Sequence, residues 1–362
     1  MNSVLSNWSD LLELLPADLE ASAKEHKAFL RARGVPSASA LLQLFLVYST
    51  TSLSFRQTVA WAEASQTARL TDVSLIERME RSESWLLHLV GQMLEQARPV
   101  VSSACRPVHL VDATTVRTPK GGLWRVHIVY NAQTGCFEQI RIEDEHIAET
   151  FSNFDAEPGV LYVGDRGYNK QGGIEAMLKE HAQILCRVRG SKYLQHANPN
   201  AIVEHSVPTG RIIIAPIPQE KQLKVEKKLK RRAVKRQTKL QAKTLEINRY
   251  VFLFCSDPTL TSEEILALYR WRWQVELLFK RLKSLQGLDE ITVNSPPLCR
   301  AVLLCHTLVY LIAQKLSQKM TALFPPESLE AAVSLAALAI PLSTNPTGFT
   351  LPAIPVLSEE RL

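Results

Sequence analysis

The sequence predicts an α/β fold organised around a mixed sheet, and two observations lead to this prediction. Three β-branched segments, 107–116, 123–130 and 136–143, follow one another across short turns, which is typical of antiparallel hairpins. Two further strand segments, 160–163 and 184–188, are connected by a helical segment, and helix-linked strands are typical of α/β sheets. The 362 residues are 46% hydrophobic, which is sufficient for a sizeable core.

The region before the predicted sheet, residues 1–100, is expected to be helical, because apolar residues recur in it at helical spacing. Within it, segments 54–64 and 74–79 predict two short helices with a polar joint. Two interpretations are open: a helix-turn-helix that contacts DNA, and a plain helical bundle. The candidate DNA contacts of the first interpretation are Arg56, Gln57, Arg69 and Arg78.

The region after segment 184–188 interrupts the alternation of strands and helices. Residues 191–257 contain short strands, prolines and a basic block, which predicts an inserted, mostly β subdomain. A long helix follows it, and then a buried helix over 301–316. The chain is therefore expected to consist of a helical region 1–100, a first part of the α/β core 101–190, a β-rich basic insertion 191–257, a second part of the core 258–290 and a helical C-terminal region 291–362.

The positive charge of the chain is concentrated in one block. The net charge is +6, but residues 221–243 hold eleven Lys and Arg against one acid, Glu226, so the block carries +10 and the remainder about −4. Two interpretations are open for this block: an exposed arm or helix that binds DNA, and a solvated charge run. Its candidate DNA contacts are Lys227, Lys228, Lys230, Arg231 and Arg232.

Cysteine usage and hydropathy indicate where the protein is expected to act. The six cysteines are scattered without a CxxC pair, which predicts small buried side chains of a reducing compartment and neither a zinc site nor a disulfide framework. The N-terminal segment lacks the pattern of a signal peptide. The longest apolar runs, 301–313 and 331–342, are expected to be too short to span a bilayer. A cytoplasmic protein without a membrane segment is therefore expected.

Residues 261–287 predict one long helix with a polar face and an apolar face. Thr261 or Ser262 can cap its start, acids occupy its first turn, and Gly287 follows its end. At about 100° per residue, its polar side chains fall within roughly 80° of one another. This face is either a solvated surface with an ion pair between Glu276 and Lys280 or a functional site. The polar residues are Tyr269, Arg272, Glu276, Lys280 and Lys283, and the neighbouring apolar arc holds Leu268, Val275, Leu278, Phe279, Leu282 and Leu285.

Two aspartates join the glutamate of this helix in a candidate metal site. Asp112 lies inside an apolar strand, where a carboxylate is costly unless it is paired or binds a cation; the alternative is a strand-end position with a satisfied hydrogen bond. Asp165 follows strand 160–163 at a junction where α/β sheets place ligand groups; the alternative is a helix cap or an Asx-turn. With Glu276 they form the layout of an RNase H-like active site. Such carboxylates hold two Mg²⁺ ions about 3.5–4 Å apart for phosphodiester chemistry.

Several motifs resemble those of one protein family. The spacing of four polar residues on the predicted helix resembles the YREK signature of DDE transposases of the insertion-sequence-four family. The sequence GDRGY at 164–168, the first-strand sequence VDATTV at 111–116 and the following WRVH at 124–127 also resemble that family. The resemblance covers roughly residues 107–286. The signature reads Tyr269-x2-Arg272-x3-Glu276-x6-Lys283.

The resemblance implies a transposase that cleaves DNA at transposon ends and transfers the freed 3′ hydroxyl into target DNA, which is cut-and-paste transposition. It implies three carboxylate ligands for two Mg²⁺ ions, with Mn²⁺ as a substitute, and further residues that contact the phosphates of the transposon end. The implied ligands are Asp112, Asp165 and Glu276, and the implied phosphate contacts are Tyr269, Arg272 and Lys283, to which Lys280 is added from its place on the helix.

The resemblance also implies the partners of the protein. These are the inverted repeats at the transposon ends, the target DNA and a second copy of the chain, because paired ends require a homodimer. The expected place of action is the bacterial cytoplasm, at the nucleoid when the protein is bound to DNA. Two alternatives are open: an RNase H-like nuclease that does not transfer strands, and a non-catalytic DNA-binding protein derived from a transposase.

Overall fold

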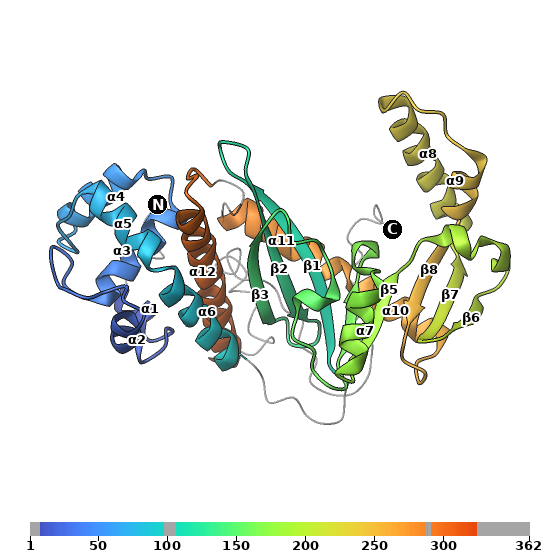
Figure 1. Ribbon diagram of the computed structural model, residues 1–362, viewed down its shortest axis with the longest axis horizontal. Coiled ribbons are helices and arrows are strands. Elements are labelled where there is room, and N and C mark those ends of the chain that lie inside the picture. The colour runs from blue at the N-terminus through green and yellow to red at the C-terminus, as the bar shows by residue number, and fades with distance from the viewer. Residues whose placement is uncertain (1–7, 98–105, 287, 289–290, 324–362) are drawn as a thin grey trace.

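The computed structural model describes residues 8–97, 106–286, 288 and 291–323, and Figure 1 shows an elongated molecule with a helical bundle at one end and a sheet beside it. The first hundred residues are helical, as predicted. The bundle is formed by α1 (Trp8–Leu12), α2 (Leu19–Glu25), α3 (Ala38–Thr50), α4 (Phe55–Ala64), α5 (Asp72–Arg81), α6 (Glu83–Ala97) and α12 (Pro296–Leu323).

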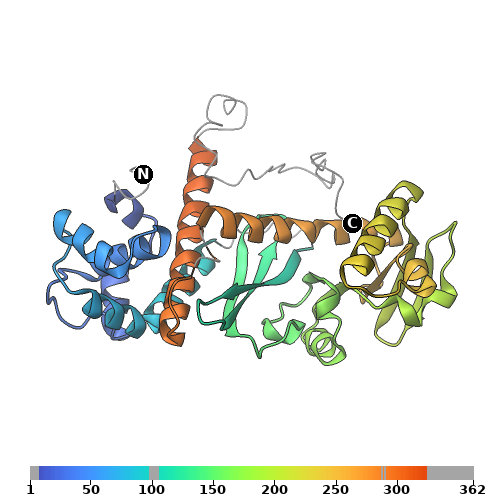
Figure 2. The ribbon, with the colours of Figure 1, turned by 90° about the horizontal axis from the view of Figure 1, so that it is seen from above.

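The bundle is held together by the apolar surfaces of two central helices. Ser37 caps α3 by accepting a hydrogen bond from the Ala40 N–H, and eleven of the 13 residues of α3 are buried. α12 packs against α6, α3 and α5, and Figures 1 and 2 both show it beside the N-terminal helices. The C-terminal helix predicted over 301–316 is confirmed as buried, and it belongs to the same bundle as the N-terminal region.

α12 also corrects one expectation. The run 301–313 was expected to be too short for a bilayer, but the helical stretch Pro296–Lys319 is long and apolar enough to cross a membrane by length and composition. Its most apolar window is 72% buried inside the protein, which is typical of a core helix. The run 331–342 lies outside the described residues.

The predicted mixed α/β sheet is confirmed, and the fold is the RNase H-like arrangement. Its order is β3-β2-β1-β4-β5-β8-β7-β6, in which β1, β4 and β5 pair in parallel and the remaining neighbours are antiparallel. The strands are β1 (Val108–Arg117), β2 (Leu123–Asn131), β3 (Phe137–Asp144), β4 (Leu161–Gly164), β5 (Gln183–Arg187), β6 (Val203–Val207), β7 (Gly210–Pro216) and β8 (Tyr250–Cys255).

The predicted insertion does not form a sheet of its own. β8 pairs with β5 through Leu185 and Cys255, and β7 and β6 follow it, so the strands of residues 191–257 extend the central sheet. The unpaired edge of β5 explains this arrangement, because it offers backbone groups that the next apolar strand of the chain can satisfy. The basic block forms α8 (Gln219–Lys235) and precedes α9 (Ala242–Ile247).

Helices cover both faces of the sheet. Figure 2 shows α10 (Ser262–Trp271) and α11 (Trp273–Gln286) crossing one face, and α7 (Gln171–Lys179) lying on the other. α7 packs with the aromatic rings of the short turns η1 (Phe151–Asn153) and η2 (Arg166–Tyr168). The two faces therefore have separate apolar cores, and the core beneath α10 and α11 is continuous with the helical bundle.

The long helix predicted over 261–287 is two helices. Thr261 and Glu264 form the capping box that starts α10, and the helix is interrupted at Arg272. The N–H groups of Arg272 and Val275 bond to carbonyls three residues earlier, so the chain tightens there and continues in nearly the same direction. Its predicted apolar arc is confirmed at Leu268, Val275, Leu278, Phe279 and Leu282, whereas the Leu285 side chain lies outside the described residues.

The cysteines confirm the expectation of small buried side chains. Five of them, Cys136, Cys186, Cys255, Cys299 and Cys305, are free and buried, and Cys105 lies outside the described residues. Burial raises the pKa of the Cys186, Cys255 and Cys305 thiols, which makes them poor nucleophiles.

Candidate active site

Two aspartates lie where neighbouring parallel strands separate. The parallel pairing of β1 with β4 ends at Leu110 and Val163. Asp112 and Asp165 each follow this last pair by two residues, so they project toward the same face of the sheet, beside each other. β1 continues past Asp112 as a partner of β2, with Asp112 opposite Ile128. Strand pairing thus brings together two acids that are distant in the sequence.

Asp112 is a largely buried carboxylate. Only 17% of its side chain is exposed, and its Oδ1 accepts a hydrogen bond of 2.9 Å from the Ala113 N–H. Burial raises the pKa of Asp112 to about 7, against the opposing effects of the Ala113 bond and Arg272; the charges of Asp165 and Glu149 raise it further. Deprotonated Asp112 is therefore destabilised until a cation is bound beside it.

Asp165 caps the turn η2 as well as facing Asp112. Its Oδ1 accepts a hydrogen bond of 2.6 Å from the Gly167 N–H. The alternative offered by the sequence, a helix cap, is therefore present in the structure. The two roles are compatible, because a carboxylate has two oxygens and this bond uses one of them.

Glu276 is connected to the sheet by Arg272. Nη2 of Arg272 donates to Oε1 of Glu276 at 2.5 Å, and Nη1 lies 3.7 Å from Oδ2 of Asp112. Burial acts to lower the pKa of Arg272, but Tyr269, Glu276 and Asp112 together raise it above its ordinary value. The guanidinium thus bridges an acid of α11 and an acid of β1 as a permanent cation.

The predicted ion pair between Glu276 and Lys280 is wrong. Among the described side chains, Glu276 forms its ion pair with Arg272, and Lys280 is exposed to solvent. The two residues are neighbours on the helix, but Arg272 lies on the side of Glu276 that faces the sheet and has a second carboxylate to bind.

The other predicted phosphate contacts surround this group. Tyr269 is half-buried at the end of α10; burial raises its pKa, Arg272 and Arg187 oppose this, and the charge of Asp165 adds to it. Tyr269 is therefore subject to the charges of both Arg272 and Asp165. Nζ of Lys283 donates to the Thr115 carbonyl of β1 at 3.1 Å, which fixes α11 over that strand. In the absence of DNA, Lys283 therefore binds a backbone carbonyl of β1.

The donor set fits a divalent cation. Carboxylate oxygens are the ligands that Mg²⁺ prefers, and a cation, Arg272, already lies between two of them. Gly167 provides room beside the acids, since a Cβ there would come within 3 Å of Oδ1 of Asp165. Among the described residues, no three acids, His or Cys are close enough to form a metal cage on their own. The site is therefore a set of carboxylates neutralised by arginine.

Sequence reasoning did not identify Glu149, which lies beside Asp165. The two charges interact, because Asp165 raises the pKa of Glu149 after the larger effect of burial. In the sequence, Glu149 follows three other acids in the polar connection 143–149, and no local pattern distinguishes it from them. Only the tertiary structure, which places this connection against η2, shows its position.

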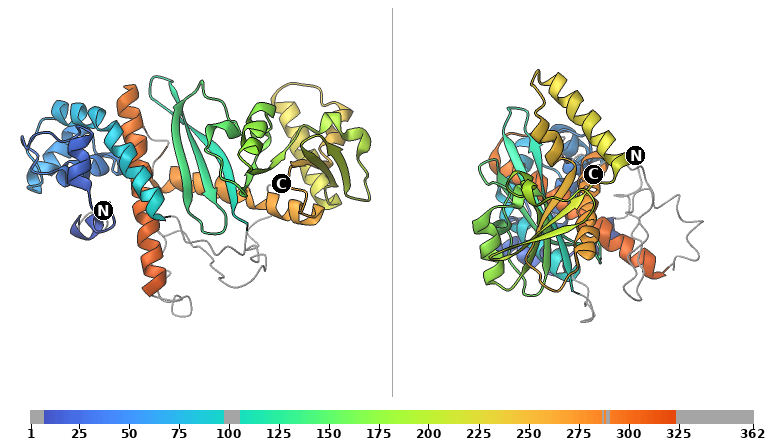
Figure 3. Two further views of the ribbon diagram at one scale, coloured as in Figure 1. Left: turned by 60° about the horizontal axis from the view of Figure 1, so that its bottom comes forward. Right: turned by 90° about the vertical axis from the view of Figure 1, so that its right-hand side faces the viewer.

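The basic block lies at the far end of the sheet from the bundle (Figures 1 and 3). α8 has no buried residue, and its one ion pair among the described side chains joins Lys230 to Glu226 at 2.6 Å. The helical interpretation of the block is confirmed, while its contact with DNA stays a prediction. All five predicted contacts are exposed: Lys227, Lys228, Lys230, Arg231 and Arg232.

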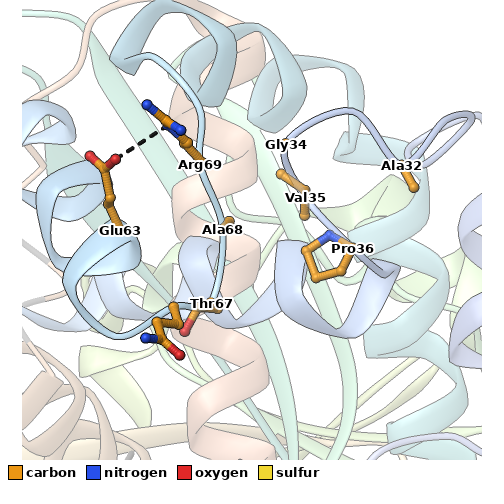
Figure 4. Close-up of a pocket in the computed structure, with 9 residues that line it drawn as sticks. Ala32, Gly34, Val35, Pro36, Glu63, Thr67, Ala68 and Arg69 are labelled. Atoms are coloured by element: carbon orange, nitrogen blue, oxygen red, sulfur yellow. Dashed lines mark ion pairs between the residues drawn. The ribbon is translucent and has the colours of Figure 1, made fainter.

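The predicted helix-turn-helix corresponds to α4 and α5. Their connection, 65–71, is longer than the usual turn of three to four residues, which favours the plain bundle. A hollow of about 410 Å³ lies beside this connection. Figure 4 shows the residues that line it, among them Arg69, which pairs with Glu63 at 3.3 Å. The other candidate contacts are Arg56, which lies 3.8 Å from Asp72, the exposed Gln57, and Arg78, which donates to the Arg33 carbonyl.

Comparisons with known proteins agree with this geometry. Residues 103–312 match the family described as transposase DDE domain. The chain is 29% identical to the transposase for insertion sequence element IS421 of Escherichia coli, over 91% of this chain and 98% of that protein. It is 29% identical, with the same coverage, to InsL of insertion sequence element IS186A of Escherichia coli strain K12. The protein y4zB of Sinorhizobium fredii is 24% identical over 61% of this chain and 63% of its own length.

Proposed function

The chain belongs to the DDE transposase family, whose members cleave DNA and generally use divalent metal ions, and on this premise we propose that it moves an insertion sequence by cut and paste. In this proposal it is of the insertion-sequence-four type and carries the YREK signature on α10 and α11. It acts in the bacterial cytoplasm, on element ends held within the nucleoid.

The observation that carries the proposal is the arrangement of three acids on neighbouring elements, two of which share one arginine. Asp112 and Asp165 come from adjacent strands, and Glu276 is connected to Asp112 through Arg272. Two strands and a packed helix hold these side chains, so the site is preorganised without loops. A non-catalytic DNA-binding protein would not require a buried acid such as Asp112, whose pKa burial raises to about 7 despite the nearby Arg272.

Each residue has a role in the proposed reaction. Asp112, Asp165 and Glu276 would hold two Mg²⁺ ions, or Mn²⁺ in their place, which activate water and then the 3′ hydroxyl and stabilise the leaving oxygen. Arg272 is partly exposed and presents a planar fork that suits bidentate contact with a phosphate. Tyr269 and Lys283 flank it on the same helices, and Lys280 extends the cationic surface into solvent.

In the proposal, Arg272 also exchanges its carboxylate partners for a phosphate of the DNA. While DNA is absent, it neutralises Glu276 and Asp112. A bound phosphate would attract the guanidinium and would leave Asp112 and Glu276 available to a divalent cation, so that substrate binding and metal binding would be coupled through this one side chain. The ion pairs of the free protein therefore compete with the productive arrangement.

DNA is bound over a wider surface in the proposal. The exposed cations of α8 attract the phosphate backbone without reading its sequence, and the helical bundle contacts the inverted repeat at the element end. Two copies of the chain pair the two ends before cleavage, as a homodimer on DNA. Terminal inverted repeats on either side of the gene would supply the cognate substrate.

The proposal is tested with DNA that carries an element end. With Mg²⁺ or Mn²⁺, the wild-type protein should nick this DNA and join the freed 3′ end to a second, labelled DNA. Glu276→Gln and Asp112→Asn should lose both reactions by a factor of about 10³ or more while they retain DNA binding.

Each alternative has its own outcome. Nicking without joining, under conditions that assemble both ends, would indicate a nuclease. DNA binding without nicking by the wild-type protein, with either metal, would indicate a non-catalytic DNA-binding protein and would overturn the proposal. Glu263→Gln serves as the matched control, because it removes the same charge as Glu276→Gln from an exposed position of α10, and it should nick and join DNA as the wild type does.

A further inference from the structure

Glu149 is a half-buried acid to which the proposed mechanism assigns no role. Burial and then the charge of Asp165 raise its pKa, and Arg125 and Lys170 oppose this rise. Among the described residues, no hydrogen bond or ion pair engages its carboxylate. Arg125 of β2 does not bind this carboxylate; it donates to the Ile147 carbonyl at 2.5 Å. Partial burial without a partner is unfavourable for a carboxylate, and a cation would relieve that cost.

The position of Glu149 is defined by Gly167. A Cβ built on Gly167 would lie within 3 Å of both Oε2 of Glu149 and Oδ1 of Asp165. The two carboxylates therefore approach the same small volume from two sides, Glu149 from the connection before η1 and Asp165 from the end of β4. A side chain of any other residue at position 167 would fill the space that a shared cation requires.

A buried hydroxyl marks the same volume independently. The Tyr168 side chain is 0% exposed, and its hydroxyl has no hydrogen-bond partner among the described residues. Burial raises the pKa of Tyr168 far above its ordinary value, and the charges of Asp112, Glu149 and Asp165 add to this effect. The buried hydroxyl is therefore subject to the field of three carboxylates and has no hydrogen-bond partner among the described residues, so it is available to donate to a ligand of those carboxylates.

We propose that Glu149 is a fourth carboxylate of the metal site and binds a divalent cation together with Asp165. The proposal rests on the metal-dependent function proposed above and adds a ligand to it. With Glu149 the site holds four carboxylates, Asp112, Glu149, Asp165 and Glu276, whose summed charge two divalent ions balance. Tyr168 serves as a positioning residue, because its hydroxyl can donate to a water on the cation or to a carboxylate that binds it.

The test is direct Mn²⁺ binding to the full-length protein, followed by the decrease of the free Mn²⁺ signal in electron paramagnetic resonance. Glu149→Gln keeps the size of the side chain and removes its charge, and it should weaken Mn²⁺ binding about tenfold or more. Glu145→Gln is the matched control, since it removes the same charge from an exposed position in the same connection, and it should bind as the wild type does.

A second variant separates the metal site from a folding defect. Gly167→Ala retains every carboxylate of the sequence but puts a methyl group into the space between Glu149 and Asp165 and displaces them, so it should also weaken Mn²⁺ binding. Gly172→Ala is its control, because a Cβ at Gly172 meets no atom within 4 Å. Circular dichroism of all four variants should coincide with that of the wild type.

The outcomes separate the two proposals. If Asp165→Asn weakens Mn²⁺ binding and Glu149→Gln does not, Glu149 is not a ligand and the transposase mechanism is unaffected. If Asp165→Asn and Glu149→Gln both bind Mn²⁺ as the wild type does, neither proposal holds. Weaker binding by Glu149→Gln and Gly167→Ala, with both controls unchanged, establishes the fourth ligand.

Discussion

α11 and α8 are both rich in basic residues, but only α11 is anchored in the core. Four side chains of α11, those of Val275, Leu278, Phe279 and Leu282, are buried beneath the helix. α8 has no buried residue along its 17 positions. The comparison shows that basic residues have different effects on the two helices. On an anchored helix a charge is fixed at one place, whereas on an exposed helix the charges together produce an electrostatic field that salt can screen.

The difference extends to the partners of the charges. Arg272, at the start of α11, contacts two carboxylates from different elements, which are themselves held by strand pairing and packing. The ion pair of α8 joins Lys230 to Glu226 of the same helix. Fixed partners permit catalysis, which needs defined geometry, while exposed pairs of this kind contribute little to stability.

The first way to break the comparison is to remove an apolar side chain from each helix. Leu278→Ala should destabilise the protein by about 3 kcal/mol, because it leaves a cavity beneath α11. Leu223→Ala on α8, where the side chain is 60% exposed, should change stability by less than about 0.5 kcal/mol. Urea denaturation measures both, and equal changes would show that α8 is packed in solution.

The second way is to remove one arginine from each helix. Arg272→Ala should lower the rate of end cleavage at saturating DNA by about 100-fold, since it removes a phosphate contact that also positions Glu276. Arg272→Lys should recover only part of the rate, because an ammonium lacks the planar fork. Arg232→Ala on α8 should stay within about twofold of the wild type. A similar decrease at both positions would contradict the assignment of fixed and diffuse roles.

Much of this contrast was predictable from the sequence. The β-branched segments and their turns predict the strands β1 to β5, and the spacing on residues 261–287 predicts which side chains are buried. Asp112 was identifiable because it interrupts an apolar strand, and Asp165 because it follows the end of one. Periodicity and local chemistry carry this information, because both depend only on neighbouring residues.

The rest depends on contacts between distant segments. The union of α12 with the N-terminal helices and the pairing of β8 with β5 need tertiary structure, because an apolar face does not specify its partner. Glu276 pairs with Arg272 and not with Lys280 because Asp112 lies beside Arg272. A helix wheel of residues 261–287 cannot show this, since Asp112 belongs to a different element. Glu149 was missed for the same reason, since the turn that brings it to Asp165 leaves no pattern in the sequence.

The third prediction concerns how much the buried Asp112 carboxylate reduces the free energy of unfolding. Below about pH 4 Asp112 is protonated in the folded and the unfolded chain; as pH rises toward 7 the unfolded chain releases this proton first, so stability falls. Asp112→Asn should therefore stabilise the metal-free protein by an amount on the order of 2 kcal/mol at pH 8, and this gain should vanish near pH 4. Asp10→Asn, at an exposed position, is the control. Urea denaturation in EDTA at several pH values measures it, and a gain independent of pH would contradict the origin assigned here.

The smallest effect is expected on α8, and it should appear in the salt dependence of binding. Lys227→Gln with Lys228→Gln should reduce the slope of log affinity against log salt by about 0.9 for each phosphate that the variant no longer neutralises. Stability should stay within about 0.5 kcal/mol of the wild type, because both side chains are exposed. Lys24→Gln with Arg31→Gln removes the same charge from exposed positions in the helical bundle and tests whether net charge alone is responsible. An unchanged slope for the α8 variant, or an equal change in the bundle variant, would leave α8 as a solvated helix without a specific role in holding DNA.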